Sequence, residues 1–93
     1  MGTYYVAKDG KEFKEEKFAI AHNTYLAGKA EDNNGNKAEA INYYTTAINS
    51  YNHYPYTYDL HYVYLARART YLNMEKYDLA EDDIEGVIAY GNL

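Results

Sequence analysis

The stretch YLARARTYLNMEKYDLAEDDIEGVIAYG, residues 64–91, contains two apolar stripes with the spacing of an α-helix. Residues 73–76 interrupt the pattern, and Gly91 is a favourable residue for a helix C-terminus. Two helices joined by so short a turn must pack antiparallel. The first stripe comprises Tyr64, Leu65, Ala68, Tyr71 and Leu72, and the second comprises Tyr77, Ala80, Ile84, Val87 and Ile88.

The middle of the chain repeats the second stripe at a distance of forty residues. A capping box of Asn36 and Glu39 precedes it. The pattern predicts a helix over residues 37–51, which ends before Pro55 because proline disfavours helix in the residue before it. The repeated positions are Ala40, Tyr44, Ala47 and Ile48, which correspond to Ala80, Ile84, Val87 and Ile88.

A stripe farther upstream matches the first C-terminal stripe, but at a distance of 46 residues. We interpret the difference as an insertion in a polar loop, residues 31–36, because loops tolerate insertions. The chain then divides into a first helical hairpin over 17–53, a linker over 54–60 and a second helical hairpin over 61–93. The matching residues are Phe18, Ala21, His22, Tyr25 and Leu26 against Tyr64, Arg67, Ala68, Tyr71 and Leu72.

Residues 1–16 fit two descriptions. Asp9 and Gly10, between residues 4–6 and Phe13, are typical of a two-residue β-hairpin turn. The alternative is a tail that leads into a helix beginning near Lys11. Because an isolated two-stranded hairpin is marginally stable, the sequence favours the tail and the helix.

Close helix contact is the common theme of residues 64–80. Ala68 and Ala80 allow two backbones to approach, and Tyr71 and Tyr77 fill the space at the turn. The run Tyr64-x-x-Arg67-Ala68-x-x-Tyr71-x-x-Met74-x-x-Tyr77-x-x-Ala80 resembles the tetratricopeptide repeat. The resemblance implies an all-α fold, in which antiparallel helical hairpins stack as a short right-handed superhelix.

The first unit matches the family less well. His22 stands where the family usually has a small residue, so we expect this helix pair to be splayed. Two units are fewer than the three that such arrays usually need. We therefore expect the last helix to leave apolar surface uncovered, and a homodimer would shield it.

The resemblance also implies a binding site, because the first helices of such units line a concave groove that receives a peptide. One branch of the family holds a C-terminal carboxylate with Lys and Asn, but Ala19 and Ala66 occupy two of those positions, so this ligand is not expected. Arg69 either pairs with an acidic group of another ligand or faces solvent. The expected groove residues are Asn23 and Leu26 in the first unit and Tyr62, Leu65 and Arg69 in the second.

Tyrosine is unusually frequent, with 14 residues against two phenylalanines and no tryptophan. Some tyrosines fall on the helical stripes, and we assign them to the core. Others flank Pro55 in the linker, where no stripe demands an aromatic residue, and tyrosine is enriched where proteins bind partners. The core group is Tyr51, Tyr64 and Tyr71, and the predicted contact group is Tyr54, Tyr56 and Tyr58.

The net charge of −5 arises from the C-terminal end of the chain. From residue 75 onward six acids accompany one basic residue, Lys76. A solvated helix explains this excess, because the helix dipole favours acids near the N-terminus. The alternative is an acidic inhibitor or nucleic-acid mimic that blocks a basic site on a partner, through a face comprising Glu81, Asp82, Asp83 and Glu85.

The sequence does not indicate catalysis or nucleic-acid binding. It has no cysteine, phosphate loop or dinucleotide fingerprint, and the spacing of His53 and His61 matches no zinc motif. Nucleic-acid binding requires clustered basic residues, which the net charge argues against. We therefore predict no enzyme activity, no catalytic residue, no cofactor, no metal and no nucleic-acid ligand.

The leading hypothesis is a protein–protein interaction module. It would bind a peptide or a protein surface through the helical groove and the tyrosine-rich linker, as an adaptor does. No apolar run approaches the roughly 20 residues that span a bilayer, and no signal peptide begins the chain. We therefore expect no membrane contact and a cytoplasmic location.

Overall fold

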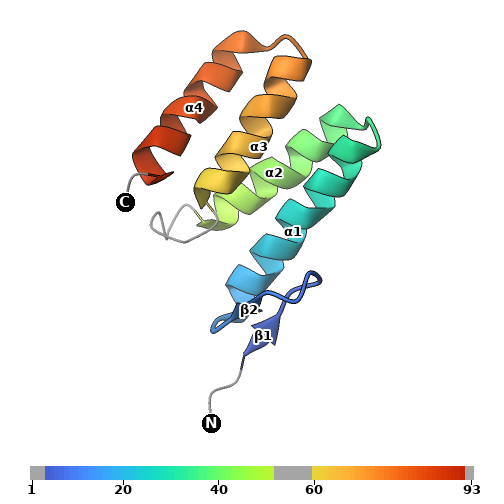
Figure 1. Cartoon of the computed structure of the whole chain (residues 1–93), viewed down its shortest axis with the longest axis vertical. Coiled ribbons are helices and arrows are strands. Elements are labelled where there is room, and N and C mark those ends of the chain that lie inside the picture. Colours follow the sequence, from blue (N-terminus) through green and yellow to red (C-terminus); the bar gives the residue numbers. More distant parts are fainter. Residues whose placement is uncertain (1–3, 52–59, 92–93) are drawn as a thin grey trace.

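A computed structural model describes residues 4–51 and 60–91, in which a small β-hairpin precedes four helices (Figure 1). The helices lie side by side in chain order, so that the second helix sits between the first and the third. The expected all-α architecture of stacked antiparallel helical hairpins is confirmed. The elements are β1 (Tyr5–Val6), β2 (Glu12–Phe13), α1 (Glu16–Asn33), α2 (Lys37–Tyr51), α3 (Leu60–Asn73) and α4 (Tyr77–Gly91).

The turns of the two helical hairpins have the same hydrogen bonds, forty residues apart. The amide of Asn36 donates to the carbonyl of Glu31, and the amide of Lys76 donates to the carbonyl of Tyr71. The central residue of each turn has positive φ, 84° at Gly35 and 60° at Glu75. The predicted insertion at residues 31–36 is therefore wrong. Most of this segment belongs to α1 and to a turn as short as that of the second unit.

Gly28, and not His22, is the small residue at the contact between α1 and α2. It lies forty residues before Ala68, and a Cβ placed on it would lie 2.7 Å from two ring carbons of Tyr44. The ring of Tyr44 is fully buried. Because the two helices are in close contact here, the expected splaying of the first unit is wrong.

The hydrophobic core is centred on α2. Tyr44, Ile48 and Tyr51 of this helix are buried between α1 on one side and Leu60 and Val63 of α3 on the other. Tyr51 therefore belongs to the core, as predicted. The two units share one core, because α2 packs against both of its neighbours.

The N-terminal region forms a β-hairpin, so the predicted helix beginning near Lys11 is wrong. Strands β1 and β2 pair antiparallel. The amide of Ala7 donates to the carbonyl of Lys11 at 2.8 Å, so that residues 8–10 form a three-residue loop. The amide of Gly10 donates to the carbonyl of Ala7 at 2.9 Å, with Gly10 at a φ of 89°. This loop is one of the common hairpin connections, with glycine in the left-handed position.

The hairpin is attached to α1 by polar contacts. The amide of Lys8 donates to Oδ1 of Asn23 at 2.8 Å. Nε2 of His22 lies 2.7 Å from Oδ2 of Asp9, and the buried imidazole also contacts the ring of Phe13. These contacts supply the packing that an isolated hairpin lacks.

Helix α4 exposes apolar residues, as predicted for the last helix. Ile84 and Ile88 are 41% and 59% exposed, whereas Tyr44 and Ile48, forty residues earlier, are 1% and 3% exposed. The difference arises because α3 covers α2, and no described helix covers α4 in the same way. Among the described helices, none is both long and apolar enough to cross a membrane.

Candidate binding site

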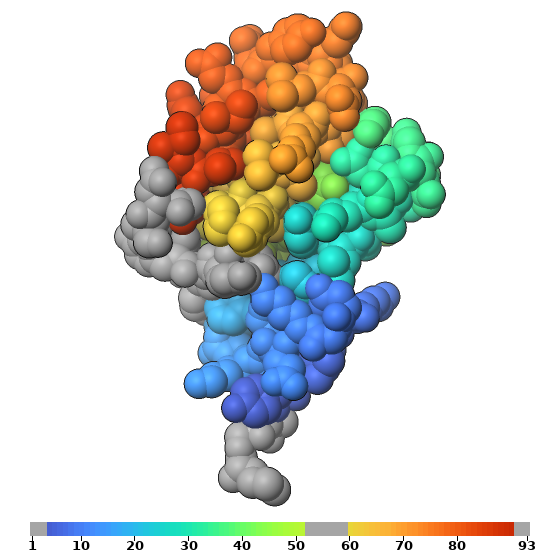
Figure 2. All heavy atoms as spheres, viewed as in Figure 1, coloured from blue at the N-terminus to red at the C-terminus, as the bar shows by residue number. Residues whose placement is uncertain are grey.

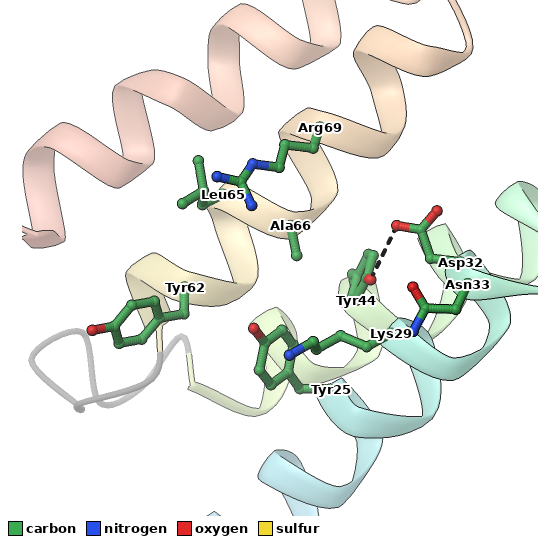
Figure 3. A pocket seen from close by; sticks show the side chains of 9 residues that line it. All are labelled: Tyr25, Lys29, Asp32, Asn33, Tyr44, Tyr62, Leu65, Ala66 and Arg69. Atoms are coloured by element: carbon green, nitrogen blue, oxygen red, sulfur yellow. Dashed lines mark hydrogen bonds between the residues drawn. The ribbon is translucent and has the colours of Figure 1, made fainter.

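A pocket of about 450 Å³ opens between α1 and α3, with α2 as its floor (Figure 3). In the space-filling view, α2 shows in green in the recess between these two helices (Figure 2). The first helix of each unit forms a wall, which is the location implied by the family resemblance. The lining residues are Tyr25, Lys29, Asp32 and Asn33 of α1, Tyr44 of α2, and Tyr62, Leu65, Ala66 and Arg69 of α3.

The two walls present equivalent residues to the pocket. Tyr25 and Leu65 are forty residues apart, and so are Lys29 and Arg69. Within each helix the apolar residue and the cation are four positions apart, so they lie on the same face. The repeat therefore produces a matched pair of apolar contacts and a matched pair of cations.

The two cations of the pocket have no carboxylate partner within residues 4–51 and 60–91. Nζ of Lys29 lies 5.4 Å from the centre of the Tyr25 ring. The close view shows the Lys29 side chain extending to the Tyr25 ring (Figure 3). Arg69 is exposed on the opposite wall. Both charges are available to a ligand.

Asp32, the acid in the pocket, is already neutralised. It accepts hydrogen bonds from Nζ of Lys37 and from Oγ1 of Thr70, the latter at 2.7 Å. Desolvation opposes ionisation of Asp32, but these hydrogen bonds outweigh it and lower its pKa. The hydroxyl of Tyr44 lies 3.4 Å from the same carboxylate, and burial raises its pKa, so it stays protonated. The uncompensated charge of the pocket is therefore positive.

Of the residues expected in a groove, those of the second unit line this pocket. Tyr62, Leu65 and Arg69 all lie on its α3 wall. Asn23 and Leu26, the residues expected from the first unit, do not line it. By the forty-residue relation between the units, the α1 residues equivalent to Leu65 and Arg69 are Tyr25 and Lys29.

Sequence reasoning missed Tyr25, Lys29 and Asp32 as lining residues of α1. The signal that would have found the first two is the forty-residue spacing to Leu65 and Arg69. Asn23 instead accepts the hydrogen bond from Lys8 and holds the β-hairpin. The linker tyrosines Tyr54, Tyr56 and Tyr58 lie outside the described residues.

The predicted acidic face loses one member. Asp83 is 2% exposed and forms a two-pronged ion pair with Arg67, in which Nη2 donates to Oδ1 at 2.6 Å and Nε to Oδ2 at 2.8 Å. Desolvation disfavours the charged guanidinium, but the hydrogen bonds to Asp83 outweigh this and raise the pKa of Arg67. Asp83 is thus a structural residue. Glu81, Asp82 and Glu85 are exposed.

In the described part of the chain, no group of three His, Cys, Asp or Glu side chains is arranged to hold a metal ion. The one close pairing of a histidine with a carboxylate there, His22 with Asp9, joins the β-hairpin to α1.

Comparison with known proteins agrees with the two-unit architecture. The family model for the tetratricopeptide repeat matches residues 21–54 and 61–90, so that the two matches begin forty residues apart. Searches of curated proteins and of solved structures give no match. Tetratricopeptide repeats generally mediate protein–protein interactions, and the family is a non-enzymatic interaction module. The matches cover more than half of the chain, which therefore belongs to the tetratricopeptide repeat family.

Proposed function

We propose that this protein binds an acidic peptide segment of a partner protein in the pocket between α1 and α3. The observation that carries the proposal is a pair of cations, Lys29 and Arg69, at equivalent positions on the two walls, neither of which has a carboxylate partner among the described residues. They stand beside an apolar surface, in a chain whose net charge is −5. A local positive site in an acidic protein selects a ligand of opposite charge.

The pocket offers two kinds of contact to such a ligand. Tyr25, Tyr62 and Leu65 provide aromatic and aliphatic surface for an apolar side chain of the peptide, and aromatic residues often dominate binding energy. Arg69 would form a bidentate pair with one carboxylate, and Lys29 would hold a second charge on the opposite wall. We also propose that the tyrosine-rich segment, residues 54–60, contributes contacts to the partner.

The alternative function, an acidic inhibitor or nucleic-acid mimic, has less support. The buried pair of Asp83 with Arg67 removes one carboxylate from the proposed acidic face. That function would also give no role to the two cations of the pocket, Lys29 and Arg69.

The test begins with the immobilised wild-type chain and a random peptide library. We expect the selected peptides to be enriched in Asp and Glu next to an apolar residue. Their affinities are then measured by fluorescence anisotropy for wild type and for the variants Lys29→Glu and Arg69→Glu. Each charge reversal should weaken binding by about tenfold or more, and added salt should weaken binding to wild type.

Lys76→Glu is the matched control. It makes the same change of charge at an exposed lysine in the turn between α3 and α4, away from the pocket, and should alter affinity less than about twofold. Selected peptides without acidic residues would contradict the proposal. So would peptides that bind the Arg69→Glu variant as tightly as they bind wild type.

A further inference from the structure

A second surface of the molecule, separate from the pocket, lies on the outer side of α4. Tyr77, Ile84 and Ile88 form a row there, which we call the α4 row, and their exposed fractions are 62%, 41% and 59%. The residues are seven and four positions apart, so they share one face of the helix. None of them lines the pocket.

The first unit shows what a surface of this kind receives. Tyr44 and Ile48 of α2, the equivalents of Ile84 and Ile88, are buried against Leu60 and Val63 of α3. Beside this apolar contact, Nη1 of Arg67 in α3 donates to Oγ1 of Thr45 in α2 at 3.1 Å. The contact therefore consists of a helix with apolar residues on one face and an arginine at its border.

The equivalent border on α4 is acidic. Glu85 lies forty residues after Thr45, where the first unit accepts the hydrogen bond from Arg67. Glu81 lies one turn earlier on the same side, and each glutamate is three residues before an isoleucine of the α4 row. Both glutamates are exposed, and neither has an ion pair with a residue in the ranges 4–51 and 60–91.

We propose that the α4 row docks an amphipathic helix of another protein, whose apolar face covers Ile84 and Ile88 and whose Arg or Lys residues pair with Glu81 and Glu85. The mode of binding is the helix-in-groove recognition that amphipathic helices commonly use. The charge of the border selects the basic helix, because an acidic or neutral one would leave the two carboxylates without partners.

A second copy of this chain fits the surface poorly. Two α4 helices would bring acids against acids, since residues 77–91 contain no Lys or Arg. Helix α1 of another copy has Ala27 where α3 has Arg67, and Asn23 where α3 has Val63. Moreover, Asn23 is already bonded to Lys8 of the β-hairpin. The required basic residue is thus missing from both helices.

The probe for this site is a stapled helical peptide with the sequence of residues 60–73, which carries Leu60, Val63 and Arg67 in the arrangement that covers α2. A matched peptide has both arginines replaced, Arg67→Glu and Arg69→Glu. Each peptide is titrated against the full chain by isothermal calorimetry. The variants are Ile84→Ser/Ile88→Ser and Glu81→Lys/Glu85→Lys, and the control is Leu79→Ser, an exposed apolar residue of α4 outside the row.

We expect the arginine peptide to bind wild type and Leu79→Ser alike. Binding should weaken by about tenfold or more with Ile84→Ser/Ile88→Ser and with Glu81→Lys/Glu85→Lys. The glutamate peptide should bind only the charge-reversed variant. Circular dichroism confirms that each variant is folded. These residues do not touch the pocket, so peptides selected for the pocket should bind all of these variants unchanged.

Three results would overturn the proposal. The first is no binding of the arginine peptide to wild type, or equal binding of both peptides. The second is undiminished binding to Ile84→Ser/Ile88→Ser. The third is a wild-type dimer in sedimentation equilibrium that becomes a monomer in Ile84→Ser/Ile88→Ser, since the row would then be covered by a second copy.

Discussion

Arg67 of α3 joins three helices through its side chain. Its guanidinium pairs with Asp83 of α4, donates to Thr45 of α2, and lies 5.7 Å from the ring centres of both Tyr64 and Tyr71. A buried pair of this kind contributes little relative to an apolar contact, but the loss of one partner leaves a buried charge uncompensated. The stability of the fold should therefore depend on whether Asp83 is present to compensate the charge of Arg67.

This arrangement predicts opposite outcomes for two adjacent acids. Asp83→Ala should lower the free energy of unfolding by about 3–5 kcal/mol, because it leaves the guanidinium of Arg67 unpaired. Asp82→Ala, at an exposed position, should change it by less than about 0.5 kcal/mol. Urea unfolding followed by circular dichroism measures both. Equal effects of the two substitutions would show that Asp83 is a surface acid after all.

At the scale of elements, the β-hairpin depends on one ionisable contact. The hydrogen bond from His22 lowers the pKa of Asp9 below its ordinary value of 3.8. A lowered carboxyl pKa means that the folded state favours the ionised form. The contact therefore stabilises the docked hairpin above pH 3.8, and this stabilisation disappears as the pH falls through the lower pKa of the folded state.

We expect the hairpin to loosen before the helices as the pH is lowered below 3.8. Amide hydrogen exchange of Ala7, Lys8 and Gly10 should then accelerate relative to that of α2, after correction for the intrinsic pH dependence of exchange. Asp9→Asn should show the loosened hairpin already at neutral pH. Equal protection of the hairpin in Asp9→Asn and in wild type would contradict this prediction. The hydrogen bond from Lys8 to Asn23 and the buried side chain of Ala7 would then be enough to hold the hairpin on α1.

At the scale of the whole molecule, Asp32 connects the two units through a side chain. It is a residue of α1, it is neutralised by Lys37 of α2, and it accepts a hydrogen bond from Thr70 of α3. The bond is charge-assisted and largely shielded from water, since Thr70 is fully buried. It supplements the apolar contact between α2 and α3 and the hydrogen bond from Arg67 to Thr45.

Thr70→Val should therefore weaken the contact between the units. It keeps the shape of the side chain but removes the donor to Asp32, and we expect a loss of about 1–3 kcal/mol in the free energy of unfolding. The control is Thr46→Val, because the hydroxyl of Thr46 bonds within its own helix, to the carbonyl of Asn42. Comparable losses in the two variants, measured by urea unfolding, would rule out a special role for the bond between the units.

The sequence predicted α2, α3 and α4 because their apolar spacing and the forty-residue repeat agree. It also predicted a helix in the region of α1 but placed its contact with α2 in the wrong register. The small residue at this contact is Gly28, a poor helix former, which hides the contact position in the pattern. The pattern favours His22 for that position instead, because its ring falls on an apolar stripe. Its actual partner is Asp9, in a hairpin that local propensity alone does not predict.

The forty-residue repeat also made half of the pocket predictable. The α3 wall follows from the well-matched second unit, whereas the α1 wall depends on a register that was wrong by six residues.

The burial of Asp83 had a detectable signal in the sequence. Arg67 and Asp83 are both eight residues from Glu75, at the centre of the turn, so an antiparallel hairpin brings them together. The distribution of charge along the chain assigns Asp83 to the surface, because it takes no account of ion pairs between helices.

The docked β-hairpin also determines at which end of the molecule a further repeat can be added. Asn23 of α1 corresponds to Val63 of α3, the residue with which a following unit contacts its predecessor, and the hairpin occupies part of that surface through Lys8. A further helical hairpin added by protein engineering could thus stack onto α4, where Ile84 and Ile88 are open. To stack before α1 it would first have to displace the hairpin. Longer arrays built from this chain should extend from the α4 side only.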